Sequence, residues 1–346
     1  MSFKVTIALI VVAMIAGVVF YFNPFVQDEE KKLPKPWFYQ VSVDDMTSIG
    51  VTFQGDSILF VKTPAGTWAF DGPGDIPPDH KRWGGIDYIL GGPQTKRDLT
   101  ETQKIIENPA QYGLDSPHTI VDIGLTLDRY LQFKLGDKTT DGYHHYGQIS
   151  GFPQLFLIAD TWGDVVARLV TEPPMPIWYV KRDPGTISEL GIFPASENAE
   201  TDESELRFKR EKDGSWTVKD YLVSTESFPV DQNRWDSILP LLSRPEGTTV
   251  AVARVSDRDY SPWGIGESSA IIEIRFKGKT ETGTVFTNGV LLLIGNKTPD
   301  GNSYYGMSDQ EGIAQPVLLL PANWVDTLLA LYDCLLYTSP SPRDRG

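Results

Sequence analysis

Hydrophobic and polar residues alternate with a period of two over many short segments of this chain. Ile49, Val51 and Phe53, for example, are separated by polar or small residues, which is typical of a strand with one buried face. We expect further strands at residues 119–127, 130–135, 143–149, 155–159, 188–192, 206–210, 216–218, 249–253, 270–276, 290–294, 304–307 and 317–320. Helical spacing occurs at 78–90, 162–170, 231–242 and 321–331. Short turns between successive strands predict mostly antiparallel sheets with few helices, an α+β class.

The same succession of motifs occurs twice. The turn Gly-Asp-Lys-Thr-Thr-Asp-Gly at 136–142 returns as Gly-Asn-Lys-Thr-Pro-Asp-Gly at 295–301, and a Tyr-Gly step upstream of it returns as Trp-Gly. A repeat of this length predicts two tandem copies of one β-meander unit with two helices each, at 37–176 and 177–333. The turn residues that mark the copies are Gly136, Asp137, Lys138, Thr139, Asp141 and Gly142, then Gly295, Asn296, Lys297, Thr298, Asp300 and Gly301.

The N-terminal segment is the most apolar part of the chain. Residues 5–22 are almost wholly apolar, and at 1.5 Å per residue such a helix spans roughly 27 Å, close to the thickness of a hydrocarbon core. We expect a transmembrane anchor and stalk over 1–36, with the N-terminus cytoplasmic and the body periplasmic, outside the inner membrane. A cleaved signal peptide is the alternative, but its apolar core is usually shorter and no small-residue cleavage site follows.

The other end of the chain fits neither copy. Residues 334–346 have no counterpart in the first copy and resemble a translated adaptor sequence, so we expect this tail to be non-native. It holds Cys334, the only cysteine of the chain. We therefore expect no disulfide and no thiolate chemistry in the body.

The composition is acidic. Forty-six Asp and Glu residues against 31 Lys and Arg residues give a net charge of −15. Because like charges repel, nucleic acid and anionic lipid are not expected as partners of the general surface.

These motifs resemble a bacterial family known as domain of unknown function family 4340. The resemblance rests on the Gly-x-Trp strand pair, the helix led by Pro and Asp, the (Tyr/Trp)-Gly-(Leu/Ile) step and the seven-residue turn, and it covers roughly residues 40–333. It implies an envelope protein with one membrane helix and, by association only, an accessory role beside ABC-transporter subunits. It implies no catalytic residues.

Gly-Asp-Lys-Thr and Gly-Asn-Lys-Thr invite comparison with phosphate-binding loops. Such a loop needs a glycine directly before the lysine and a helix after it, whereas Lys138 and Lys297 follow Asp or Asn and lead into another strand. A hairpin turn, with glycine at positive φ and Asp or Asn folded onto the backbone, explains the motif better. No cofactor is expected.

Histidines are the remaining candidates for metal ligands. His144 and His145 are adjacent, so on a strand their rings point to opposite faces, and the second copy has Ser-Tyr there. We expect one solvent-facing and one packed histidine. His80 and His118 stand alone in the sequence, which predicts no metal site.

Catalytic motifs are also missing from the sequence. It contains no Gly-x-Ser-x-Gly elbow and no Ser-x-x-Lys motif, so no catalytic residue is expected. A carboxylate pair of a glycosidase stays open, because its separation is a three-dimensional quantity.

Four of the nine tryptophans recur at matching positions, Trp68 with Trp216 and Trp83 with Trp235. Recurrence favours packing in the core, and stacking on sugar rings is the alternative. Both interpretations stay open for Trp37, Trp178 and Trp263.

Three functions follow from this reasoning. The first is a membrane-anchored, non-enzymatic envelope protein that binds a protein partner, such as an ABC-transporter-like complex, through sheet edges or the cleft between the copies. The second is a module that binds glycans or peptidoglycan fragments between the copies, which a cleft lined by aromatic rings would favour. The third is an unrecognised hydrolase, which clustered carboxylates with perturbed pKa values would favour.

Overall fold

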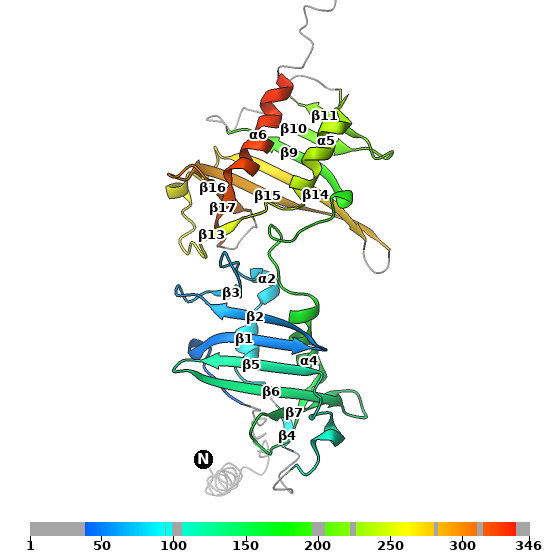
Figure 1. Ribbon diagram of the computed structural model, residues 1–346, viewed down its shortest axis with the longest axis vertical. Coiled ribbons are helices and arrows are strands. Elements are labelled where there is room, and N and C mark those ends of the chain that lie inside the picture. The colour runs from blue at the N-terminus through cyan, green and yellow to red at the C-terminus, as the bar shows by residue number, and fades with distance from the viewer. Residues whose placement is uncertain are drawn as a thin grey trace, which may run out of the picture.

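The chain folds into two antiparallel β-sheets, one in each half, stacked along the long axis of the molecule (Figure 1). The computed structural model describes residues 39–93, 95–98, 106–195, 205–221, 226–279, 283–309 and 314–336. Every strand pairing that it describes is antiparallel. With helices packed on both sheets, the α+β class is confirmed.

The expected anchor at residues 5–22 lies outside the described residues. Within the part of the chain that the structure describes, no helix has both the length and the apolar character needed to cross a bilayer.

The first sheet has the strand order β3-β2-β1-β5-β6-β7-β8-β4. Its strands are β1 (Met46–Phe53), β2 (Asp56–Lys62), β3 (Trp68–Phe70), β4 (Thr95–Asp98), β5 (Thr119–Leu125), β6 (Arg129–Lys138), β7 (His144–Ile149) and β8 (Phe156–Ala159). Helix α4 (Asp160–Thr171) packs on one face of this sheet (Figure 1). Its buried Val166 and Leu169 join a core that includes Ile49 and Phe133. The alternation seen in the sequence therefore turns one face of strands such as β1 and β6 toward the core beneath α4.

The helix predicted over 78–90 is two short helices, α2 (His80–Trp83) and α3 (Ile86–Leu90). Gly84 and Gly85 separate them at φ +48° and +80°. Both values lie in the left-handed region, which glycine reaches without a Cβ clash and which ends a right-handed helix. The first unit thus has three helices rather than the predicted two.

The second sheet has the order β12-β11-β10-β9-β14-β15-β16-β17-β13. Its strands are β9 (Ile187–Phe193), β10 (Leu206–Arg210), β11 (Trp216–Asp220), β12 (Phe228–Pro229), β13 (Thr249–Val252), β14 (Ala270–Lys279), β15 (Val285–Lys297), β16 (Ser303–Ser308) and β17 (Val317–Pro321). Apart from the edge strand β12, this order is that of the first sheet when strands are matched along the chain. Helices α5 (Gln232–Ile238) and α6 (Ala322–Leu336) cover one face (Figure 1). Short 3-10 helices are η1 (Val43–Asp45), η2 (Pro109–Tyr112), η3 (Pro184–Thr186), η4 (Leu239–Ser243) and η5 (Ser261–Trp263).

The two units meet through the loop between β3 and α2. Ile76 of this loop is buried in the hydrophobic core of the second unit. The carbonyl of Gly74 accepts a hydrogen bond of 3.1 Å from the backbone N–H of Val250 in the second unit. An apolar side chain and a backbone hydrogen bond therefore tie the units together.

Candidate functional site

The seven-residue turns close the β6–β7 and β15–β16 hairpins. In the first, Thr139 Oγ1 donates to Asp141 Oδ1 at 2.5 Å, and the same oxygen accepts from the N–H of Tyr143 at 3.1 Å. Gly142 has a φ of +75°, which favours glycine. The second turn repeats these contacts: Thr298 Oγ1 and the N–H of Asn302 both donate to Asp300 Oδ1. Its Gly301 also has a positive φ, of +74°.

Gly136 and Gly295 are required by a close approach. A Cβ on Gly136 would lie 2.0 Å from the carbonyl oxygen of Tyr112, and one on Gly295 would lie 2.3 Å from that of Trp263. Tyr112 and Trp263 end the 3-10 helices η2 and η5. The two motifs that recur in the sequence therefore form one backbone contact in each unit.

The lysine of each turn pairs with a carboxylate on the following helix. Lys138 Nζ lies 2.7 Å from Asp160 Oδ1, and Lys297 Nζ lies 3.0 Å from Asp326 Oδ2. The hydrogen bond from Lys138 holds the pKa of Asp160 below its ordinary value, and the hydrogen bond to Asp160 raises the pKa of Lys138. Both lysines are therefore engaged within the chain.

Two histidines extend this pair in the first unit. The ring of His145 is buried; its Nε2 lies 2.8 Å from Asp160 Oδ1 and its Nδ1 lies 3.0 Å from His118 Nε2. His118 Nδ1 in turn lies 2.6 Å from Thr119 Oγ1. Gly163 leaves room for the buried ring, since a Cβ there would lie 2.9 Å from His145 Cδ2. His118, isolated in the sequence, meets His145 because the sheet brings the starts of β5 and β7 together near the start of α4.

When both rings are neutral, one arrangement of their protons satisfies the three contacts between these side chains, and His145 Nδ1 also lies 3.3 Å from the carbonyl of Gly136. The hydroxyl of Thr119 then donates to His118, His118 donates to His145, and His145 donates to Asp160. Burial, and after it the neighbouring His145, lowers the pKa of His118. The arrangement is linear, and among the described residues no three His, Cys, Asp or Glu side chains are grouped as metal ligands.

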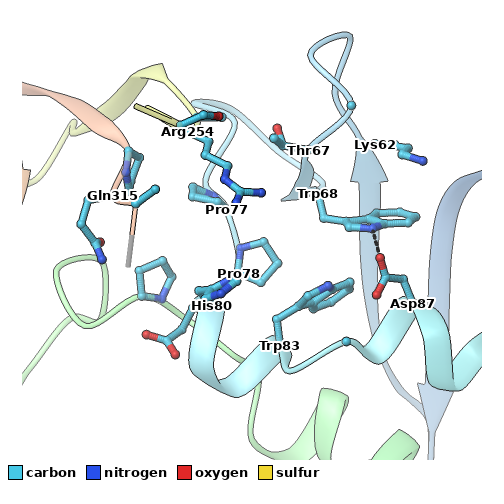
Figure 2. Close-up of a pocket in the computed structure, with 18 of the residues that line it drawn as sticks. Lys62, Thr67, Trp68, Pro77, Pro78, His80, Trp83, Asp87, Arg254 and Gln315 are labelled. Carbon is cyan, nitrogen blue, oxygen red and sulfur yellow. Dashed lines mark hydrogen bonds between the residues drawn. The ribbon is translucent and has the colours of Figure 1, made fainter. Parts of the chain in front are cut away.

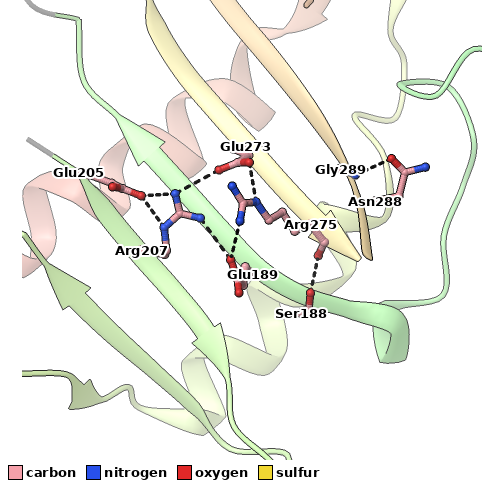
Figure 3. Close-up of polar contacts among 8 residues, drawn as sticks. All are labelled: Ser188, Glu189, Glu205, Arg207, Glu273, Arg275, Asn288 and Gly289. Carbon is pink, nitrogen blue, oxygen red and sulfur yellow. Dashed lines mark hydrogen bonds and ion pairs between the residues drawn. The ribbon is translucent and has the colours of Figure 1, made fainter. Parts of the chain in front are cut away.

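A second polar cluster lies on the β10-β9-β14 face of the second unit (Figure 3). Arg207 lies 3.2 Å from the carboxylates of Glu189 and Glu273, and it also contacts Glu205. Arg275 lies 2.6 Å from Glu273 and 3.5 Å from Glu189. Because each carboxylate has a guanidinium partner inside the cluster, these charges stabilise the sheet face.

A cleft of about 580 Å³ lies where the two units meet. The first unit contributes Trp68, Trp83 and Tyr88, and the second contributes Trp178 and Arg254. Figure 2 shows Trp68 and Trp83 on one side and Arg254 reaching from the second unit toward the loop of Pro77 and Pro78. Proline rings add flat apolar surface from Pro77, Pro78, Pro176 and Pro316. The volume of the cleft lies within the range of about 300–1,000 Å³ that ligand sites usually have.

The aromatic residues of the cleft differ in what they offer to a ligand. Trp68, Trp83 and Trp178 are no more than 9% exposed, so little of each ring is open to a ligand. Tyr88 is 75% exposed and its ring is open to solvent. Three buried tryptophan rings therefore lie beneath the cleft, and the ring of Tyr88 is the exposed aromatic surface among these four residues.

Burial confirms the prediction for the recurring tryptophans, because Trp68, Trp83, Trp216 and Trp235 all belong to the hydrophobic cores. Trp178 is also buried, whereas Trp37 lies outside the described residues. The cleft itself was not predicted residue by residue, because its lining runs from Val43 to Pro316 and shares no local motif.

Comparison with known proteins gives no match: no protein-family model fits the chain, and no curated protein or solved structure is significantly similar to it. The resemblance to family 4340 therefore rests on the motif residues alone.

Proposed function

We propose that this chain is a non-enzymatic binding protein of the bacterial envelope and that the cleft between its units holds a glycan. The observation that carries the proposal is the cleft of about 580 Å³, with aromatic and proline rings on both walls. Sugar rings present C–H faces that pack on flat apolar rings, while their hydroxyls bond to polar side chains. Thr67, His80 and Ser256 supply such polar groups in the lining.

The proposal includes the anchor and the duplication expected from the sequence. A membrane helix at 5–22 would hold the body outside the inner membrane, where cell-wall glycans are found. The matching strand order of the two sheets supports two tandem copies of one folding unit. A cleft between copies is then a site that neither copy has by itself.

Binding of N-acetylglucosamine oligomers to the full chain in mild detergent, followed by calorimetry or ligand-detected NMR, tests the proposal. Tyr88→Ala should weaken binding roughly fivefold, because loss of a stacked ring removes about 1 kcal/mol. Tyr130→Ala is the matched control, since Tyr130 is 79% exposed but lies at the start of β6, outside the cleft. Failure of the unaltered chain to bind any saccharide or soluble peptidoglycan fragment would contradict the proposal.

A protein partner, such as an ABC-transporter-like complex, is the second candidate. It is favoured by the end of the long β14–β15 hairpin, where Val285 and Phe286 are 58% and 43% exposed. Exposed apolar residues at such a position are typical of protein contacts. Phe286→Ser should reduce co-purification of transporter subunits from native membranes, whereas Phe152→Ser, in the first unit, should not. Equal recovery with both variants would exclude the hairpin as the contact.

A further inference from the structure

We infer that the ligand of the cleft between the units carries a carboxylate, so that the site recognises an acidic saccharide. This inference rests on the proposed glycan-binding function and adds the chemical class of the ligand.

The first observation is Arg254, which follows β13 in the second unit. Its side chain is exposed, lines the cleft and extends toward Pro77 and Pro78 of the first unit (Figure 2). Among the residues that the structure describes, it has no hydrogen-bond or ion-pair partner. Arg207 and Arg275 of the same unit, by contrast, each contact two or more carboxylates. In a chain with 46 acidic and 31 basic residues, an arginine without a carboxylate partner at a cleft wall is available to a ligand.

The second observation is that the carboxylates of the cleft are engaged. Asp79 accepts from the backbone N–H of Arg82 at 3.0 Å and caps α2. Asp87 Oδ2 accepts from the indole N–H of Trp68 at 3.2 Å, and its Oδ1 accepts from the N–H of Tyr88 at 3.0 Å. These hydrogen bonds orient the two carboxylates toward the chain itself.

The third carboxylate is accompanied by a cation. Asp44 follows Val43, whose carbonyl accepts a hydrogen bond of 3.1 Å from Lys62 Nζ. Lys62 and Asp44 both line the cleft. Of the lysine and arginine side chains that line the cleft, Lys62 and Arg258 have partners within the chain, whereas Arg254 has none among the described residues.

The groups of the two units complement each other. Tyr88 gives an accessible ring from the first unit, and Arg254 gives a guanidinium from the second. A guanidinium binds a carboxylate through two parallel N–H···O bonds, which fixes orientation as well as adding affinity. A ligand that has a sugar ring and a carboxylate can therefore contact both units at once, whereas a neutral sugar uses only the ring.

Two disaccharides that differ by one carboxylate test the inference on the full chain in mild detergent. They are chitobiose, which is neutral, and N-acetylglucosaminyl-N-acetylmuramic acid, which has a lactyl carboxylate. We expect the acidic disaccharide to bind about five- to tenfold more tightly, as a charge-assisted hydrogen bond predicts. The difference should shrink as sodium chloride is raised, because salt screens exposed charges.

Arg254→Gln should remove this difference, so that the acidic disaccharide binds no more tightly than chitobiose. Arg234→Gln is the matched control, because Arg234 is an exposed arginine on α5 outside the cleft. A glucuronate-containing disaccharide separates the sources: an equal gain means that any sugar carboxylate is accepted, and a smaller gain means that cell-wall glycan is preferred. Equal binding of chitobiose and the muramic acid disaccharide would overturn the inference and leave the proposed function standing. Binding of neither would overturn both.

Discussion

The β6–β7 hairpin of the first unit and the β15–β16 hairpin of the second have the same turn but different side chains behind it. In the first unit the turn lysine pairs with Asp160, the first residue of α4, and Asp160 also bonds the buried His145. In the second unit the lysine pairs with Asp326, one turn into α6, and the hydroxyl of Tyr304 donates to Asp326 at 2.7 Å. The turn residues recur because the backbone demands them, whereas the residues behind the turn only have to pack together.

The helices show the same exchange. The fourth residue of α4 is Gly163, whose missing side chain makes room for the ring of His145. The fourth residue of α6 is Val325, which is fully buried. A polar ring with a glycine in one unit thus takes the place of an apolar contact in the other.

The largest expected effect breaks what the hairpins share. Gly136→Ala should lower the free energy of unfolding by about 3 kcal/mol, because the new Cβ meets a backbone oxygen. Gly295→Ala should cost nearly as much. Gly142→Ala has open space around it but a positive φ, so about 1 kcal/mol is expected. Urea unfolding followed by tryptophan fluorescence checks the ranking, and equal costs at 136 and 142 would refute the close-approach argument.

The next effect separates the two units. His145→Leu should cost about 2 kcal/mol, because it removes the hydrogen bonds that the buried ring makes with His118 and Asp160. Tyr304→Phe should cost only about 0.5–1 kcal/mol, because Asp326 is partly exposed and water can replace the lost hydroxyl as its hydrogen-bond donor. The same unfolding measurement applies. A larger loss for Tyr304→Phe would mean that the histidine chain contributes little to the first unit.

Acid should affect the first unit before the second. The pKa of His118 is lowered in the folded protein, so below its unfolded value of about 6.5 the unfolded chain binds a proton that the folded chain resists. Stability should therefore fall as the pH drops below about 6.5. The titratable groups that influence His118 are His145, Asp137 and Lys138, and His118→Gln should flatten the slope. A slope that is the same in this variant would assign the acid sensitivity to other groups.

The smallest effect concerns the exposed lysines. Lys138 is the first cause of the lowered pKa of Asp160, whereas the hydrogen bond from Tyr304 is the first cause for Asp326. Lys138→Met should therefore raise the pKa of Asp160 toward its ordinary value, and Lys297→Met should leave that of Asp326 lowered. Carboxyl NMR titration measures both. Similar shifts in the two variants would show that Tyr304 does not dominate its site.

Much of the fold follows from local sequence patterns. The alternation of Ile49 and Val51 placed both inside the core, and the recurrence of Trp68 and Trp216 pointed correctly to burial. The break at Gly84 and Gly85 was missed because apolar spacing on either side suits one continuous helix. A pair of adjacent glycines was the signal that could have revealed it.

The candidate sites were harder to predict. His118 and His145 are 27 residues apart in the sequence. They meet because the sheet places β5 and β7 on the two sides of β6. Gly163 inside a predicted helix was the one local hint that a large side chain needed space there. Tyr88 and Arg254 come from different units, so no spacing in the sequence relates them.

The sequence by itself determined most of the strands, the hairpin turns and the α+β class, because periodicity and turn chemistry depend on residues a few positions apart. Only the tertiary structure decided that two histidines form a series of hydrogen bonds with Asp160. It also decided that aromatic rings and an arginine from two units line one cleft. Such contacts depend on strand order and on how the units dock, which are set by packing between residues far apart in the chain.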